Sequence, residues 1–378
     1  MRRLLLIIPL VALTAVPSLA QARAVPRGFY GMVYDGKLAD APAATQKPQF
    51  DLMARSGVES IRTTFSWAAA QPQPDGPIGF GTTDPLVAGA ATHNMRLLPV
   101  VLLPPHWAAA NDGPGVAPPR RVSEYARYLT ALVERYGRAG SFWSEHPELP
   151  RRPIREWQIW NEPHIPGFWN VRSGPQGWVQ GYGRLLRASY RAIKDVDPGA
   201  RVVLAGLASD SWRLLNLIYR EGRIRRYFDA AAVHPYAATP ELALRVVRLF
   251  RRTMRRAGDR RKRIYVTEIT WAASRGRTAT LPHDRFFTTT DRGMARRVGR
   301  AYGLFARYSR SLRLTRVYWY TWSSSYRRNG GRYDFFNFSG LVRWNGREAT
   351  PRRALRAYRA SARRSQRCVK TSAGVCRR

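Results

Sequence analysis

Two glutamates in this chain follow short apolar segments, a placement that suits them to acid–base chemistry. Glu162 follows the segment 157–161 and precedes Pro163, and Glu268 follows the segment 263–267. Bulky and aromatic residues favour a strand, whereas proline cannot donate to its ladder and biases the preceding residue toward extended geometry. Each carboxylate is therefore expected at the exit of a buried strand. Two such groups are the parts needed to cut a glycosidic bond.

A structural role is the alternative for both glutamates. A buried carboxylate costs desolvation energy unless it has a partner, so Glu162 and Glu268 could be held by arginines inside the fold. Both segments place a glutamate directly after an apolar run, and this shared pattern favours a catalytic role over a structural one. Other glutamates are predicted to be surface charges on helices or near helix ends: Glu124, Glu134, Glu221 and Glu241.

Strand-like and helix-like segments alternate from residue 28 to about residue 362. Eight apolar segments are predicted strands: 29–34, 60–65, 96–103, 154–160, 201–207, 230–234, 264–268 and 316–322. Five segments with apolar residues at helical spacing are predicted helices: 122–136, 178–196, 242–257, 293–308 and 351–363.

This alternation predicts a single (β/α)₈ TIM barrel, an α/β fold in which eight strand–helix repeats close one parallel sheet. The strands are continuous apolar runs, as at 97–103, which is typical of strands buried on both faces. An open doubly wound sheet is the alternative, but it normally carries a G-x-G-x-x-G turn that the segment 34–37 lacks. A barrel keeps its chemistry at the carboxyl ends of the strands, so Glu162 and Glu268 should meet there.

The first 24 residues predict a secretory signal peptide. Basic residues at 2–3 precede an apolar run at 4–17, and small residues at 18–24 offer cleavage positions. A membrane anchor is the alternative, but the run is short for a span and contains Pro9 and Pro17. No later segment is long and apolar enough to cross a bilayer. We therefore expect a secreted protein.

Residues 25–366 are the predicted catalytic domain, and 367–378 are a tail. The tail holds the chain's two cysteines, Cys368 and Cys376, which secretion would allow to form a disulfide. Two free thiols are the alternative. Neither the number of cysteines nor their spacing from histidines resembles a metal site, so no metal is predicted.

The formal net charge of +39, from 64 lysine and arginine residues against 25 acidic ones, is extreme. One interpretation is association with a polyanion or cell wall, and the other is a solvated surface rich in arginine. The arginines are spread along the chain rather than gathered in a tail, which favours the second interpretation. No specific nucleic-acid partner is predicted.

The ordered set of motifs resembles the retaining glycoside hydrolases of clan A. The sequence 160–163 (Trp-Asn-Glu-Pro) resembles that clan's acid/base motif on strand four, and Glu268 its nucleophile on strand seven. Arg62 resembles the strand-two arginine near the nucleophile, and His234 with Tyr236 the strand-six His-x-Tyr. The resemblance implies Glu162 as acid/base, Glu268 as nucleophile and no cofactor.

Within that clan, the residues after the proline are most like the family-39 β-xylosidase type, because Phe168 and Trp169 follow soon after it. The family-5 cellulase type is the alternative. His164 departs from the common motif, in which asparagine is frequent. The substrate class implied is a polysaccharide or oligosaccharide, and which sugar is read by the loops rather than by the barrel motifs.

The resemblance implies double displacement, with the two carboxyls about 5–5.5 Å apart. Arg62 and Tyr236 would keep Glu268 ionised, whereas an aromatic shell from Trp160 and Trp169 would favour protonated Glu162. Asn161 would bond the sugar's 2-hydroxyl, a contact that strengthens in the transition state.

Aromatic residues are further candidates for binding sugar. Trp319 or Trp322 resembles the strand-eight tryptophan that floors the first sugar subsite. His106 and Trp107 end the third strand and could contact a sugar. Trp169 and Trp271 could be stacking platforms, although aromatic residues at such positions are usually core. A different class of function remains: a non-catalytic barrel that binds carbohydrate or polyanion.

Overall fold

The computed structural model describes residues 23–111, 115–171, 177–278, 282–325, 335–366, 369–370 and 376–377. Residues 1–22 and Cys368 lie outside this range, so the signal peptide and the disulfide stay predictions. Among the helices of the described residues, none has the length and hydropathy that a bilayer span requires.

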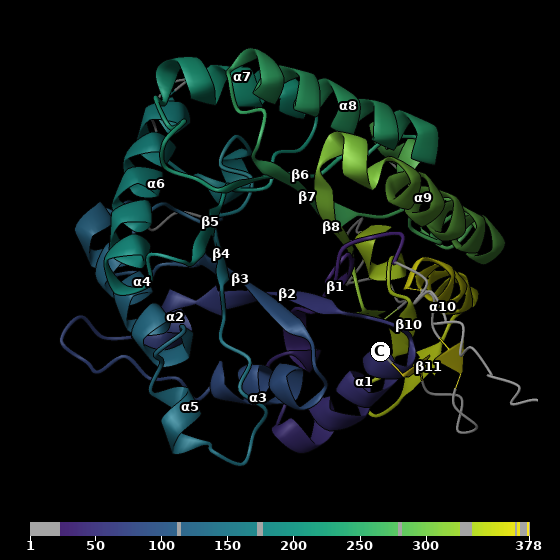
Figure 1. Cartoon of the computed structure of the whole chain (residues 1–378), viewed down its shortest axis with the longest axis horizontal. Helices are drawn as coiled ribbons and strands as arrows, with labels where there is room; N and C mark the ends of the chain where they lie inside the picture. The colour runs from purple at the N-terminus through teal and green to yellow at the C-terminus, as the bar shows by residue number, and fades with distance from the viewer. Residues whose placement is uncertain are drawn as a thin grey trace, which may run out of the picture.

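Eight parallel strands close into a barrel at the centre of the molecule (Figure 1). Each strand pairs with the next, and β8 returns to β1 through the Tyr30–Val317 register. This confirms the predicted single (β/α)₈ barrel. The strands are β1 Tyr30–Val33, β2 Ser60–Ser66, β3 Arg96–Leu102, β4 Glu156–Ile159, β5 Arg201–Val203, β6 Ala230–Val233, β7 Arg263–Ile269 and β8 Leu314–Trp319.

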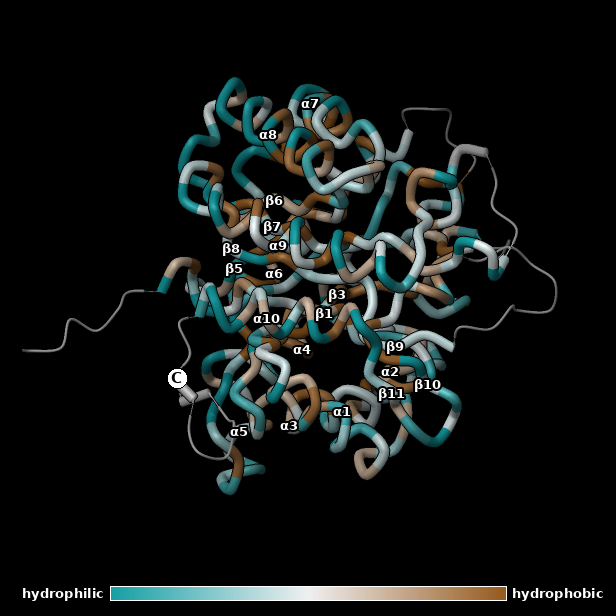
Figure 2. The backbone as a smooth tube through the Cα atoms, turned by 90° about the vertical axis from the view of Figure 1, so that its right-hand side faces the viewer, coloured by the Kyte–Doolittle hydropathy of each residue, from teal (hydrophilic) through white to brown (hydrophobic). Residues whose placement is uncertain are grey.

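A ring of helices surrounds the strands, and α10 closes the ring between α9 and α1 (Figure 1). Their inward faces are apolar and their outward faces hydrophilic, as the brown and teal segments of Figure 2 indicate. The helices are α1 Ala43–Arg55, α2 Trp67–Ala70, α3 Asp84–Thr92, α4 Val122–Tyr136, α5 Phe142–Glu145, α6 Gly177–Val196, α7 Ser211–Glu221, α8 Pro240–Arg256, α9 Asp291–Leu312 and α10 Arg353–Gln366.

A small three-stranded sheet follows the barrel, and sequence reasoning did not anticipate it. It consists of β9 Ser323–Ser324, β10 Val342–Trp344 and β11 Ala349–Pro351. The predicted helix start at residue 351 is therefore wrong. Pro351 pairs with Val342 on the outer strand of this sheet, where a residue without an N–H is tolerated.

The amino ends of the strands are tied together by a buried ionic group. Glu156, at the start of β4, is 3% exposed. Its Oε1 accepts hydrogen bonds from Tyr265 Oη at 2.6 Å, Arg201 at 3.0 Å and Arg316 at 3.3 Å. Burial alone would raise the pKa of Glu156, but Arg316, Tyr265 and Arg201 together lower it. Glu156 is thus a structural glutamate held by barrel arginines.

Replacing Glu156 tests the structural role of this buried ionic group. In Glu156→Ala the Arg316 guanidinium stays buried without its counter-charge, so the free energy of unfolding should fall by about 3–5 kcal/mol. Urea titration measures the change. Glu134→Ala, at an exposed position of α4, should stay within about 0.5 kcal/mol of wild type. A loss at Glu156 no larger than the loss at Glu134 would contradict the structural role.

Candidate active site

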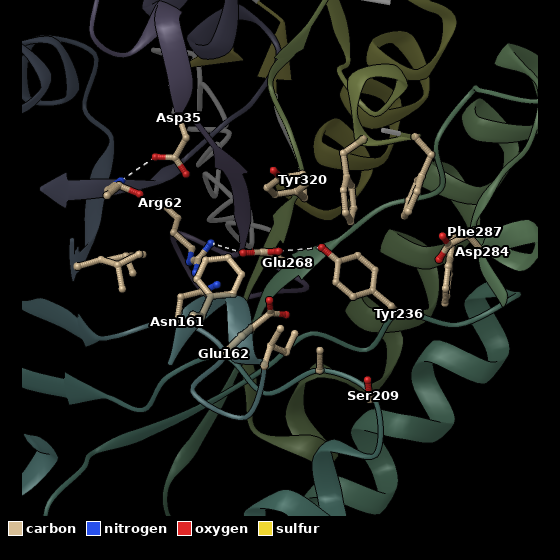
Figure 3. A pocket seen from close by; sticks show the side chains of 18 residues that line it. Asp35, Arg62, Asn161, Glu162, Ser209, Tyr236, Glu268, Asp284, Phe287 and Tyr320 are labelled. Atoms are coloured by element: carbon tan, nitrogen blue, oxygen red, sulfur yellow. Dashed lines mark hydrogen bonds and ion pairs between the residues drawn. The ribbon is translucent and has the colours of Figure 1, made fainter. Parts of the chain in front are cut away.

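A cavity of about 550 Å³ opens at the carboxyl ends of the barrel strands (Figure 3). Ser209, between β5 and α7, and Asp284, before α9, contribute to its polar lining, and the other polar lining residues come from six strands. The latter are Asp35 after β1, Arg62 and Thr64 on β2, Asn161 and Glu162 after β4, Tyr236 after β6, Glu268 on β7 and Tyr320 after β8. The barrel therefore brings the two predicted glutamates into one cavity.

Glu268 is held on both oxygens. Arg62 Nη1 donates to its Oε1 at 2.7 Å, and Tyr236 Oη donates to its Oε2 at 2.7 Å, as Figure 3 shows. Burial alone would raise the pKa of Glu268, but the charges of His234 and Arg62 and these hydrogen bonds outweigh it and lower the pKa. Glu268 is therefore kept as a carboxylate.

Arg62 is 2% exposed, and all three nitrogens of its guanidinium donate hydrogen bonds inside the barrel. Besides Glu268, it donates from Nε to Gln158 Oε1 at 2.8 Å and from Nη2 to Asn161 Oδ1 at 2.7 Å. The bond to Asn161 occupies the amide oxygen. The amide nitrogen is then the part of Asn161 that can donate to a ligand.

Glu162 does not have the extended geometry that Pro163 predicts. Its φ is 41°, and that of Trp160 is 70°, both in the left-handed region that non-glycine residues rarely occupy. Between them, Asn161 bridges to Gly206 of the neighbouring segment, and Glu162 N donates to Gly206 O at 3.2 Å. A backbone strained in this way costs about 1–3 kcal/mol per residue, and these contacts hold it in place. The turn leaves the Glu162 side chain in the lining of the cavity.

His234 lies between the two glutamates. Its Nδ1 is 2.7 Å from Glu162 Oε1 and 3.6 Å from Glu268 Oε2, and the ring is fully buried. The ring fits because Gly206 has no side chain: a Cβ there would lie 2.0 Å from His234 Nε2. A carboxylate oxygen of each glutamate and a nitrogen of His234 all lie within 4.8 Å of one another.

Such a group of two carboxylates and an imidazole could in principle hold a metal ion. Its bonding fits proton transfer better. Arg62 and Tyr236 already donate to both oxygens of Glu268, and the arginine charge would oppose a cation there.

The structure brings together six of the predicted residues: Arg62, Asn161, Glu162, His234, Tyr236 and Glu268. The expectation that Trp319 or Trp322 floors the cavity is wrong. Trp319 Nε1 donates to Ser339 O at 2.9 Å and Trp322 Nε1 to Gln49 Oε1 at 3.0 Å, and both rings are fully buried. Tyr320 lines the cavity instead, because successive side chains at a strand end point to opposite sides.

The other predicted sugar contacts also lie outside the cavity lining. Trp169 packs edge-on against Trp160 with ring centres 5.4 Å apart, so this pair forms core rather than a shell around the cavity. Trp271 Nε1 donates to Ala237 O, and Trp107 Nε1 donates to Gln71 O. His106 is exposed.

Phenylalanines supply the apolar wall that the tryptophans do not. Phe287 precedes α9, and Phe335 and Phe336 belong to the segment after β8. Their rings pack on one another, with Phe287 and Phe335 stacked at 6.2 Å. The aromatic run at 335–338 is the sequence signal for this wall.

Asp35 is a third carboxylate of the cavity that sequence reasoning missed. Its Oδ1 accepts from Thr64 N at 2.7 Å and from Thr63 Oγ1 at 3.3 Å. Burial raises the pKa of Asp35, against the opposing charge of Arg62. Its position just after β1 could have identified it, by the same strand-end rule that identified Glu162 and Glu268.

Solved structures share this architecture at low sequence identity. A family 39 glycoside hydrolase from Bacteroides cellulosilyticus superposes with a TM-score of 0.67 at 18% identity, over 92% of this chain and 65% of that protein. A GH39 β-xylosidase from Caulobacter crescentus gives 0.62 at 18% identity, over 90% and 72%. An exo-β-1,4-mannosidase from an Opitutaceae bacterium gives 0.60 at 16% identity, over 89% and 59%.

These structures are glycoside hydrolases of the kind that the motifs resemble. At such identities the similarity establishes the fold. This chain spans slightly less than two thirds of the length of the Bacteroides protein. No protein-family model matches the chain, and no curated protein matches its sequence.

The fit of His234 over Gly206 can be tested directly. In Gly206→Ala the new methyl group overlaps the imidazole, so the ring must move away and the free energy of unfolding should fall by about 1–3 kcal/mol. The matched control is Gly299→Ala in α9, where no atom lies within 4 Å of the new Cβ. That change should stabilise the protein by roughly 0.5–1 kcal/mol, since alanine favours a helix. Equal effects of the two changes would rule out the close fit.

Proposed function

We propose that this protein is a secreted retaining β-glycosidase that acts by double displacement on a polysaccharide or oligosaccharide. The observation that carries the proposal is the bonding of Glu268. An arginine and a tyrosine keep it ionised in a cavity where a second carboxyl, Glu162, lies close by. A barrel that only bound carbohydrate would need neither a buried, doubly held carboxylate nor a second acid beside it.

In the first step, Glu268 attacks the anomeric carbon while Glu162 gives its proton to the leaving oxygen. The glycosidic bond breaks, and an ester between the sugar and Glu268 forms. The Asn161 amide nitrogen would donate to the sugar's 2-hydroxyl, since its oxygen is occupied by Arg62.

In the second step, Glu162 takes a proton from water, and the resulting hydroxide equivalent attacks the anomeric carbon and releases Glu268. His234, 2.7 Å from Glu162, orients the carboxyl and shares its hydrogen bond as the proton comes and goes. The short separation within the group of Glu162, His234 and Glu268 supports retention, because an inverting pair lies about 6.5–9.5 Å apart to admit water.

The cavity suits a sugar because it combines polar groups with an aromatic wall. Asp35 and Ser209 can bond hydroxyls, and Phe336 and Phe287 offer apolar surface to the faces of a ring. The similar structures include a xylosidase and a mannosidase, so the fold alone does not select the sugar.

Replacement of Glu268 tests the nucleophile. Glu268→Ala should lower kcat/KM for an aryl β-glycoside by on the order of 10⁴-fold, because no covalent intermediate can form. Glu134→Ala on the surface of α4 is the control and should retain wild-type rates. If the purified Glu268→Ala protein still hydrolyses the substrate, the nucleophile is misassigned. If the wild type binds glycans but turns over none of a broad panel, a binding barrel is the better description.

Replacement of Glu162 tests the acid. Glu162→Ala should slow substrates with poor leaving groups far more than dinitrophenyl glycosides, since a good leaving group needs little protonation. The comparison of kcat/KM across aryl leaving groups measures this. A uniform loss for all leaving groups would contradict a proton-donor role.

The lowered pKa of Glu268 predicts a pH profile. A carboxylate whose pKa is depressed stays ionised as pH falls, so the acidic limb of kcat/KM should lie below the usual titration range of glutamate. Arg62→Met removes the charge and one hydrogen bond, which raises the pKa of Glu268 and moves this limb to higher pH. Tyr236→Phe should move it less, in the same direction. An unmoved limb in Arg62→Met would show that another group sets it.

A further inference from the structure

A second cavity, of about 540 Å³, lies at the opposite end of the barrel from the candidate active site. Arg96, Arg201 and Arg263, the first residues of β3, β5 and β7, line it. The carboxyl end of α9, the start of β8, and Pro26 and Arg27 before β1 complete the wall. We call it the arginine cavity, because seven of its eleven lining residues are arginines and none of the eleven is acidic.

The arginine content of the chain does not account for this cluster. Lysine and arginine together make up 64 of 378 residues, so about two basic residues would be expected among eleven. The cluster is also poor in counter-charge. Glu156 pairs with Arg201 and Arg316, whereas Arg96, Arg263 and Arg313 form no ion pair within the described part of the chain.

Three buried donors of the cavity lining lack a hydrogen-bond partner among the described residues. They are Arg316 Nε, Ser309 Oγ and Thr315 Oγ1. Arg316 is 3% exposed. A buried polar group without a partner is costly, and a ligand acceptor that reached these side chains would remove that cost.

The cluster is preorganised rather than loose. Arg316 is fixed by donation from Nη1 to Arg27 O at 2.9 Å and from Nη2 to Glu156 at 3.3 Å. Gly28 makes room for it: a Cβ there would lie 2.9 Å from Arg316 Cζ and 3.0 Å from Arg96 Cδ. Burial and the neighbouring charges of Arg316 and Arg201 lower the pKa of Arg96, as expected for cations held together.

We propose that the arginine cavity binds a compact polyanion, a small molecule or inorganic chain that carries two or more phosphate or sulfate groups. Guanidinium forks and hydroxyls are the donors that match tetrahedral oxyanions. The arginines surround a concave site of ligand size, which favours a compact ligand over a long polymer on the surface. The carbonyl end of α9 disfavours an anion, so the arginines must supply the attraction.

Calorimetric titration with inorganic tripolyphosphate tests the proposal. The wild type should bind it with an affinity that falls as salt rises. The triple variant Arg96→Ala/Arg263→Ala/Arg313→Ala should bind at least about tenfold more weakly, because it loses three charged donors. The matched control removes the same charge from exposed positions of α4, α6 and α7: Arg127→Ala/Arg191→Ala/Arg220→Ala.

The control should keep wild-type affinity to within about threefold, since screening weakens distant charges. Equal losses in the two triple variants would overturn the proposal in favour of diffuse surface charge. Absence of tripolyphosphate binding by the wild type at low salt would overturn it outright. Inorganic phosphate and inorganic sulfate, as second and third probes, distinguish phosphate from sulfate as the preferred group.

A charge-neutral variant gives an independent measurement. Ser309→Ala/Thr315→Val removes two unpartnered hydroxyls and no charge, and should weaken tripolyphosphate binding several-fold while retention on a heparin column stays unchanged. Unchanged tripolyphosphate affinity would contradict a ligand seated on these groups. Thermal unfolding verifies that each variant is folded. Neither measurement needs glycoside hydrolysis, so this proposal and the proposed function stand or fall separately.

Discussion

The buried ion pair between Arg62 and Glu268 is the constraint on which the rest of the site depends. The two side chains are 3% and 11% exposed, so either charge alone would carry a desolvation penalty of several kcal/mol. Arg62 meets that constraint with a rigid fork that also bonds Gln158 and Asn161. One guanidinium on β2 thereby fixes side chains of β4 and β7, and the lowered pKa of Glu268 is a consequence of the same bonds.

The Glu162 side of the site is held by a strained backbone, whereas the Glu268 side is held by charge. Glu162 lines the cavity because the chain leaves β4 through two left-handed residues, and Gly206 both accepts its N–H and leaves space for His234. Such strain persists only where the surroundings over-determine it. Here the closed barrel supplies that support, because the Gly206 backbone and His234 both hold Glu162 in place.

Sequence patterns predicted the barrel and its two glutamates because both follow from period and position, whereas Arg62, Asn161, His234 and Tyr236 were expected from the resemblance to clan A. Buried parallel strands are continuous apolar runs, and a carboxylate just after such a run must lie at the rim. The tryptophan at the end of β8 could not be assigned in this way. A shift of one residue at a strand end turns a side chain from the cavity to the core, and this shift separates Trp319 from Tyr320. The left-handed φ of Glu162 contradicts the local bias of Pro163, because tertiary bonds override it.

Each end of the barrel brings together side chains of like charge and compensates them with a side chain of the opposite charge. At the carboxyl end, acidic groups gather and Arg62 compensates them, whereas at the amino end arginines gather and Glu156 compensates two of them. The second arrangement follows from barrel layering, in which inward residues of alternate strands share one level. Arg96, Arg201 and Arg263 begin the odd strands β3, β5 and β7, and near the start of the remaining odd strand Gly28 leaves the space that Arg316 fills. The sequence therefore contains a signal for the arginine cavity that composition alone hides. Arginines spread evenly along a chain still converge when the fold places strand starts side by side.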